Sequence, residues 1–202
     1  SFFYFYYLCV DNFLDFMQNR KLLNIELGRV SASEYKELPE SGIVVVLDNI
    51  RSAHNVGSAF RTSDSFKIDK VWLCGICAVP PSAEIHKSAL GAEDSVAWEH
   101  VDDTMDAISR LKEDGYTIVC AEQTVGSVML DAFKPEPGRK YAVVFGNEIA
   151  GVRQDVVDAA DMCLEIWAFA ARWRRSDCGR RDYQYAQVLR HAHDSPQDGY
   201  AV

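Results

Sequence analysis

Five short runs of apolar, largely β-branched residues recur along the chain, and each is nearly continuous rather than alternating with polar residues. They cover residues 43–47, 71–74, 117–121, 141–145 and 162–166. Continuous runs of this length are typical of strands that are buried on both faces of a parallel sheet. The pattern therefore predicts five central strands.

Helical patterns lie between these runs. Residues 102–114 carry Met105, Ile108 and Leu111 at helical spacing, with Asp102 or Asp103 placed to cap the start and a glycine at position 115 to end the helix. A second helix is predicted at about 152–160, and 55–66 can form a third. Alternating strands and helices predict an α/β fold, a mostly parallel sheet flanked by helices, with ligands at the carboxyl ends of the strands.

The chain of 202 residues suits a single domain. The stretches 38–42, 79–84 and 133–140 have turn chemistry but are too short to link domains. The opening "SFFYFYYLCV" is too short to span a bilayer, and the first methionine is Met17. We expect residues 1–16 to be a non-native or disordered extension, 17–166 to be the domain, and the protein to have no membrane partner.

Charge is unevenly distributed along the chain. The formal net charge is −9, and residues 167–202 hold six Arg against four Asp, so the body carries −11 and the tail +2. An acidic body does not exclude a local basic site for nucleic acid. The six cysteines are scattered and favour a reducing cytoplasm; the pair Cys74 and Cys77 lacks the partners of a zinc or thioredoxin-like site and is interpreted as two incidental thiols.

The first polar cluster follows the run 43–47. The common dinucleotide and P-loop fingerprints are absent from the sequence, and the segment instead places Asn55, Gly57 and Arg61 at close spacing. A glycine there lets another backbone or a ligand approach closely, and the Arg61 fork suits a phosphate. The alternative is a solvated helix with an ion-paired arginine.

The second cluster is "VVFGNEIAGV", residues 143–152, where a buried strand ends in Gly146, Asn147 and Glu148 and Gly151 precedes the next helix. Gly146 permits a tight turn, and Glu148 at the end of the strand is placed to bind a ligand or to orient Arg61. A glycine-punctuated turn is also common in α/β proteins without such a site.

Together and in this order, the two clusters resemble the motifs of the SpoU (TrmH) class of S-adenosylmethionine-dependent RNA 2'-O-methyltransferases, in the SPOUT superfamily. Asn55, Gly57 and Arg61 match the first motif, and the second, F-G-x-E-x-x-G, is matched in full from Phe145 to Gly151. The resemblance implies a carboxyl-terminal trefoil knot, a homodimer, tRNA or rRNA as substrate, and no metal. It also implies donor-binding residues, namely Thr124, Gly146, Asn147, Gly151 and Ile166.

The expected chemistry follows from the reactants. A sulfonium methyl is already activated, so the enzyme must align the ribose oxygen with it and help the hydroxyl to lose its proton. Arginine is effectively always protonated, so we expect Arg61 to clamp the neighbouring phosphate while that phosphate or a water takes the proton. Asn55 and Glu148 are expected to hold Arg61 and the ribose in place, and the dimer to gather the RNA-binding residues Arg51, Arg61 and Lys87 into one cleft. His54 and His86 are the alternative bases.

The resemblance ends after the last apolar run. The family's third motif should follow Ile166, but the chain continues "WAFAARW" and then an Arg-rich segment. A change of reading frame near Ile166 is the most economical account, and a native basic RNA-binding arm is the alternative. The loss also leaves open a catalytically dead RNA-binding or dimerisation protein of the same fold, while an unrelated flavodoxin-like module would require both motifs to match by chance.

Overall fold

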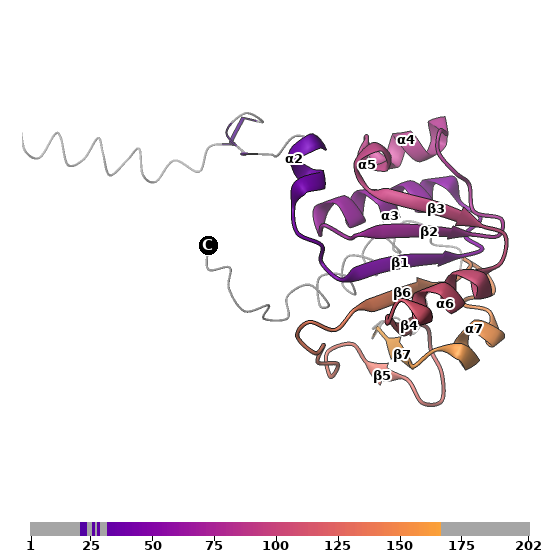
Figure 1. The fold of residues 1–202 in the computed structure, drawn as a ribbon. Coiled ribbons are helices and arrows are strands. Elements are labelled where there is room, and N and C mark those ends of the chain that lie inside the picture. The colour runs from indigo at the N-terminus through magenta and orange to yellow at the C-terminus, as the bar shows by residue number, and fades with distance from the viewer. Residues whose placement is uncertain (1–20, 24–25, 27, 29–31, 167–202) are drawn as a thin grey trace, which may run out of the picture.

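The computed structural model describes residues 21–23, 26, 28 and 32–166, and Figure 1 shows their arrangement. Within this part of the chain the strands form one seven-stranded sheet of order β3-β2-β1-β6-β4-β7-β5. All neighbouring strands are parallel. The strands are β1 (Ile43–Asp48), β2 (Lys70–Cys74), β3 (Ala97–Val101), β4 (Thr117–Ala121), β5 (Val128–Met129), β6 (Tyr141–Phe145) and β7 (Met162–Glu165).

The five predicted strands and their parallel pairing are confirmed. The prediction missed β3 and β5, which form the two edges of the sheet. Strand β3 has the sequence AWEHV and is buried only at Val101, so it lacks the apolar run by which the central strands were recognised. Strand β5 has only two residues, too few to show a pattern.

Helices cover the sheet from both sides (Figure 1). They are α2 (Ala32–Glu37), α3 (Ala53–Ser65), α4 (Ala83–Ala89), α5 (Ala92–Ser95), α6 (Thr104–Glu113) and α7 (Gln154–Ala159). The core on one face joins β1, β2 and β6 to α3, α4 and α5, and the core on the other joins the central strands to α6 and α7. Because each central strand is buried on both sides, the apolar runs are continuous rather than alternating.

The start of α3 is fixed by its own sequence. Ser52 caps the helix by accepting a hydrogen bond from Asn55 N at 3.2 Å. Ala59 and Phe60 are buried in the core as expected. A Cβ on Gly57 would lie 2.4 Å from Ile85 O of α4, so the close approach predicted at this glycine is made by another backbone.

The predicted cap of α6 is Asp103, whose carboxylate accepts from Met105 N at 2.9 Å. Ile108 and Leu111 are buried as predicted, and Gly115 follows the end of the helix with φ +81°. No helix in the described part of the chain is long and apolar enough to cross a membrane. Residues 1–16, the tail 167–202 and the segment that would form a knot lie outside the described residues.

Candidate functional site

The candidate site lies at the carboxyl ends of the central strands. Strand β1 is followed by the loop to α3, β4 by residues 122–127, β6 by the turn 146–151, and β7 by Ile166. In the sheet β6 lies between β1 and β4, and β7 lies beside β4. Parallel order therefore brings all four connections to one edge, where α/β sheets bind their ligands.

Glu148 joins the two motifs. Its carboxylate accepts hydrogen bonds from Asn55 Nδ2 at 2.8 Å, Arg51 N at 2.9 Å and Ser52 N at 3.2 Å. Burial alone would raise the pKa of this carboxyl group, but the hydrogen bonds from Arg51, Asn55 and Ser52 outweigh it and lower the pKa below its usual value. Glu148 is therefore an ionised anchor for the start of α3.

Acid should weaken this anchor. Because the pKa of Glu148 is lower in the folded than in the unfolded chain, its contribution to stability is complete above the unfolded value of about 4.3 and is lost as the pH falls through the folded value. We expect Glu148→Gln to lower the free energy of unfolding near neutral pH and to lose less of it on acidification than the wild type. Urea unfolding at a series of pH values measures both. The control is Glu136→Gln, an exposed carboxylate paired with Arg139; a Glu148→Gln profile parallel to the wild-type profile would contradict the prediction.

Arg61 lies apart from this anchor. Among the described residues the Glu148 carboxylate accepts hydrogen bonds from the Asn55 side chain and from the backbone of the loop before α3. That Glu148 and Asn55 hold Arg61 in the complex with RNA stays a prediction. Arg61 is exposed and lines a cavity of about 410 Å³ together with His54, Ser58, Thr62, Ser65, Phe66 and Ser88. The arginine therefore faces open space large enough for a phosphate and its sugar.

The two histidines have different surroundings. His54, treated above as a loop residue, lies in the first turn of α3 and shares the cavity with Arg61. His86 lies on α4, where its Nδ1 is 2.6 Å from Glu93 Oε1, and it lines a separate cavity with Pro81 and Trp98. Of the two alternative bases, the structure brings only His54 beside Arg61.

The turn after β6 is closed by its own polar groups. Asn147 and Gly151 exchange two backbone hydrogen bonds of 2.9 Å, and Asn147 Nδ2 donates to Asn49 O at 2.7 Å. A Cβ on Gly146 would lie 2.0 Å from Val152 N, so only glycine fits there. Gly151 has φ +75°, which also favours glycine. Asn147 Oδ1 accepts from Ile149 N at 2.9 Å and from Ala150 N at 3.1 Å, so this side chain both closes the turn and ties it to the loop after β1. Its contact with a donor stays a prediction.

The loop after β4 is tied to the end of β7. Gln123 Nε2 and Ser127 Oγ donate to the two carboxylate oxygens of Glu165 at 2.8 and 2.9 Å. This brings Thr124 on that loop to the same edge as Gly146 and Ile166, as the family resemblance implies. The ends of three neighbouring strands, β6, β4 and β7, thus form one wall of the candidate site.

The chemistry of this wall suits the proposed donor. S-adenosylmethionine carries a sulfonium cation and a flat adenine. The carboxylates at the strand ends, Asp48, Glu122, Glu148 and Glu165, accept hydrogen bonds within the protein and therefore offer a cation negative potential rather than free acceptors. Val125 is fully exposed and Ile149 is 61% exposed, so both loops present apolar side chains to a ligand. The residues present therefore fit the group.

The expected RNA-binding residues are all accessible. Arg51 precedes α3, Arg61 lies on α3 and Lys87 lies on α4, and each side chain is exposed. Ser88 Oγ donates to His54 O at 2.9 Å and so fastens α4 to the start of α3. These basic residues therefore belong to adjoining elements, and their gathering into one cleft stays a prediction.

The cysteines in the described residues are buried and free, as the sequence suggests. Cys77 Sγ donates to Leu47 O at 3.3 Å and accepts from Ile50 N at 3.2 Å. Burial raises the pKa of Cys74 to about 12 and that of Cys77 to about 11. Both are therefore protonated packing groups and not nucleophiles.

Comparison with known proteins agrees with this geometry. Residues 42–170 match the model of the SpoU rRNA Methylase family. The chain is 34% identical over 133 residues to a 23S rRNA (guanosine-2'-O-)-methyltransferase RlmB of Nitrosomonas europaea, covering 64% of this chain and 48% of the relative. The chain thus spans about half the length of the curated relatives that it matches.

Solved structures show the same fold. The TrmH/SpoU tRNA modifying enzyme of A. aeolicus superposes with a TM-score of 0.66 at 22% identity, with 80% of each chain covered. An AdoMet-bound rRNA methyltransferase from Sinorhizobium meliloti gives a TM-score of 0.66 at 22% identity, covering 78% of this chain and 59% of that one. At this identity the likeness establishes the fold.

Proposed function

The chain belongs to the SpoU rRNA Methylase family, and from that premise we propose that it transfers a methyl group from S-adenosylmethionine to a ribose 2'-hydroxyl of tRNA or rRNA. The observation that carries this proposal is the hydrogen bond of 2.8 Å between Asn55 Nδ2 and Glu148 Oε1, residues 93 positions apart. It brings the two motifs together at the strand ends, where an α/β sheet binds its ligands.

Arg61 is proposed to position the RNA. Its guanidinium lines an open cavity and makes no hydrogen bond or ion pair with the other described residues. Its planar fork can therefore grip the phosphate beside the target ribose with two parallel hydrogen bonds. That phosphate or a water then accepts the hydroxyl proton, since arginine itself stays protonated.

Asn55 and Glu148 are proposed to act through the backbone. Their bond, with those from Glu148 to Arg51 N and Ser52 N, fixes the first turn of α3 and with it the direction in which the helix presents Arg61. Positioning of this kind supplies much of the rate of a transfer between two bound groups.

Bound S-adenosylmethionine would supply an activated methyl group that needs no metal. The residues proposed to hold it are Thr124, Gly146, Asn147, Gly151 and Ile166, at the ends of β4, β6 and β7. Family membership also supports a homodimer in the cytoplasm with RNA as partner, in which Arg51 and Lys87 bind the RNA backbone.

The second candidate is an RNA-binding or dimerisation protein that has lost transfer. It is favoured by one observation, the absence of the family's third motif after Ile166. Resequencing of the coding DNA tests the origin of that tail, because an intact third motif in another frame would exclude a native basic arm.

Donor binding separates the two functions. In a calorimetric titration of S-adenosylmethionine into this chain, the methyltransferase proposal predicts binding at micromolar strength, about −8 kcal/mol. No heat of binding, with the fold intact by circular dichroism, would favour the second candidate. Tritium transfer to bulk tRNA and to rRNA then identifies the substrate class.

A further inference from the structure

Two carboxylates hold the chain where it leaves the turn after β6. Strand β6 lies between β1 and β4 in the sheet. Asp48 ends β1, Glu122 follows β4, and each accepts one of two consecutive backbone amides. Val152 N donates to Glu122 Oε2 at 2.9 Å, and Arg153 N donates to Asp48 Oδ2 at 2.8 Å. The turn is thus held from both neighbouring strands.

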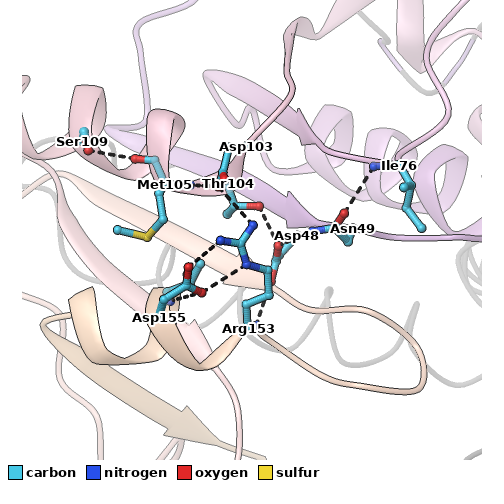
Figure 2. Close-up of polar contacts among 10 residues, drawn as sticks. Asp48, Asn49, Ile76, Asp103, Thr104, Met105, Ser109, Arg153 and Asp155 are labelled. Carbon is cyan, nitrogen blue, oxygen red and sulfur yellow. Dashed lines mark hydrogen bonds and ion pairs between the residues drawn. The ribbon is translucent and has the colours of Figure 1, made fainter.

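Asp48 is fully buried, and Figure 2 shows its surroundings. Its Oδ1 accepts from Thr104 Oγ1 at 2.6 Å and from Asn49 Nδ2 at 2.9 Å. The guanidinium of Arg153 points instead to Asp103 and Asp155 at the surface. Arg153 therefore donates to the buried carboxylate through its backbone N–H alone. Arg153 is the first residue before α7, and that helix has no side-chain cap of its own.

Glu122 holds the other amide. Its second oxygen accepts from Gln123 N at 2.9 Å, which fixes the carboxylate at the end of β4. A Cβ on Gly151 would lie 2.2 Å from Glu122 Oε2, so the carboxylate also occupies the space beside that glycine. The glycine of the second motif and Glu122 therefore fit one another.

We propose that Asp48 and Glu122 form a carboxylate clamp and act as positioning residues for methyl transfer. This inference rests on the proposed function. The clamp fixes residues 146–153 over the end of β6, and this turn carries both the proposed donor contacts at Gly146 and Gly151 and the anchor Glu148. Loosening the clamp displaces the donor wall and the start of α3 together.

The two carboxylates can be tested separately. Asp48→Leu and Glu122→Met roughly keep the size of the side chains but remove both acceptor oxygens, so the backbone N–H of Arg153 or of Val152 loses its partner. We expect hydrogen exchange to accelerate about tenfold or more at the amide of Arg153 in the first variant and of Val152 in the second. We also expect the affinity for S-adenosylmethionine and kcat to fall by a similar factor.

A second pair of variants guards against a general loss of folding. Thr104→Val removes the hydroxyl that orients Asp48 but leaves the carboxylate, and should produce a smaller effect of the same kind. Glu136→Gln, an exposed residue before β6, is the matched control and should change none of these quantities.

The outcomes separate the clamp from the function. Accelerated exchange with unchanged donor affinity and kcat would overturn the positioning role, and unchanged exchange would overturn the clamp itself. If the wild-type chain binds no donor, the proposed function fails and the positioning role with it. The exchange measurement still decides in that case whether the clamp exists.

Discussion

Arg61→Lys should reduce kcat for methyl transfer about a hundredfold and leave the affinity for S-adenosylmethionine unchanged. Lysine keeps the positive charge but replaces a planar fork of five donors by a single point charge. A phosphate bound through one ammonium can rotate, so the ribose hydroxyl loses its alignment with the methyl group. The proposed donor contacts lie on other elements, at the ends of β4, β6 and β7, and are not touched by the change.

Rates of tritium transfer from labelled donor to the RNA class that the wild type modifies measure this effect. Arg110→Lys is a matched control, because Arg110 lies on α6 and pairs with Glu99 at the surface. We expect the control to retain wild-type kcat. Undiminished transfer by Arg61→Lys would contradict the proposal that Arg61 grips the phosphate. It would favour His54, which lines the same cavity, as the group that acts on the hydroxyl.

The sequence predicted the central strands because burial on both faces leaves a continuous apolar run. Val44, Val45 and Val46 of β1 are examples, each at most 2% exposed. The same reasoning could not find β3, since an edge strand faces solvent and Glu99 and His100 interrupt its apolar residues. Residues 97–101 form a strand because they pair with β2, and this pairing depends on residues far away in the sequence.

Local motifs also located the two halves of the site but not the way in which they meet. Asn55 and Glu148 were found from their own segments, yet their partnership depends on β6 lying next to β1. The separation of Arg61, on α3, from Glu148 has a simple cause. Residues six apart on a helix lie about 120° apart around its axis, so Asn55 can face Glu148 while Arg61 does not.

Asp48 and Glu122 were missed for a related reason. Both follow apolar runs and resemble ordinary polar residues at strand ends. Their partners are backbone amides 105 and 30 positions away, and an amide leaves no signature in a sequence. The one available signal was the acidic residue directly joined to a fully buried strand, since a buried carboxylate needs hydrogen-bond donors.

Gly146→Ala is expected to lower the free energy of unfolding by about 3 kcal/mol and to abolish detectable donor binding. The added Cβ would lie 2.0 Å from Val152 N and 2.1 Å from Gly151 C, and both are backbone atoms that cannot rotate away. The turn would have to open, and the Val152 N–H, which donates to Glu122, would move with it.

Urea unfolding and calorimetric titration of S-adenosylmethionine measure the two effects. The control is Gly138→Ala in the turn before β6, where an added Cβ would meet nothing within 4 Å and φ is +74°. It should lower stability by about 1 kcal/mol through backbone strain alone and leave donor binding unchanged. Unchanged stability in Gly146→Ala would mean that the turn relaxes without cost. Lost stability with normal donor binding would separate the packing of the turn from its proposed role, and would place the donor away from the end of β6.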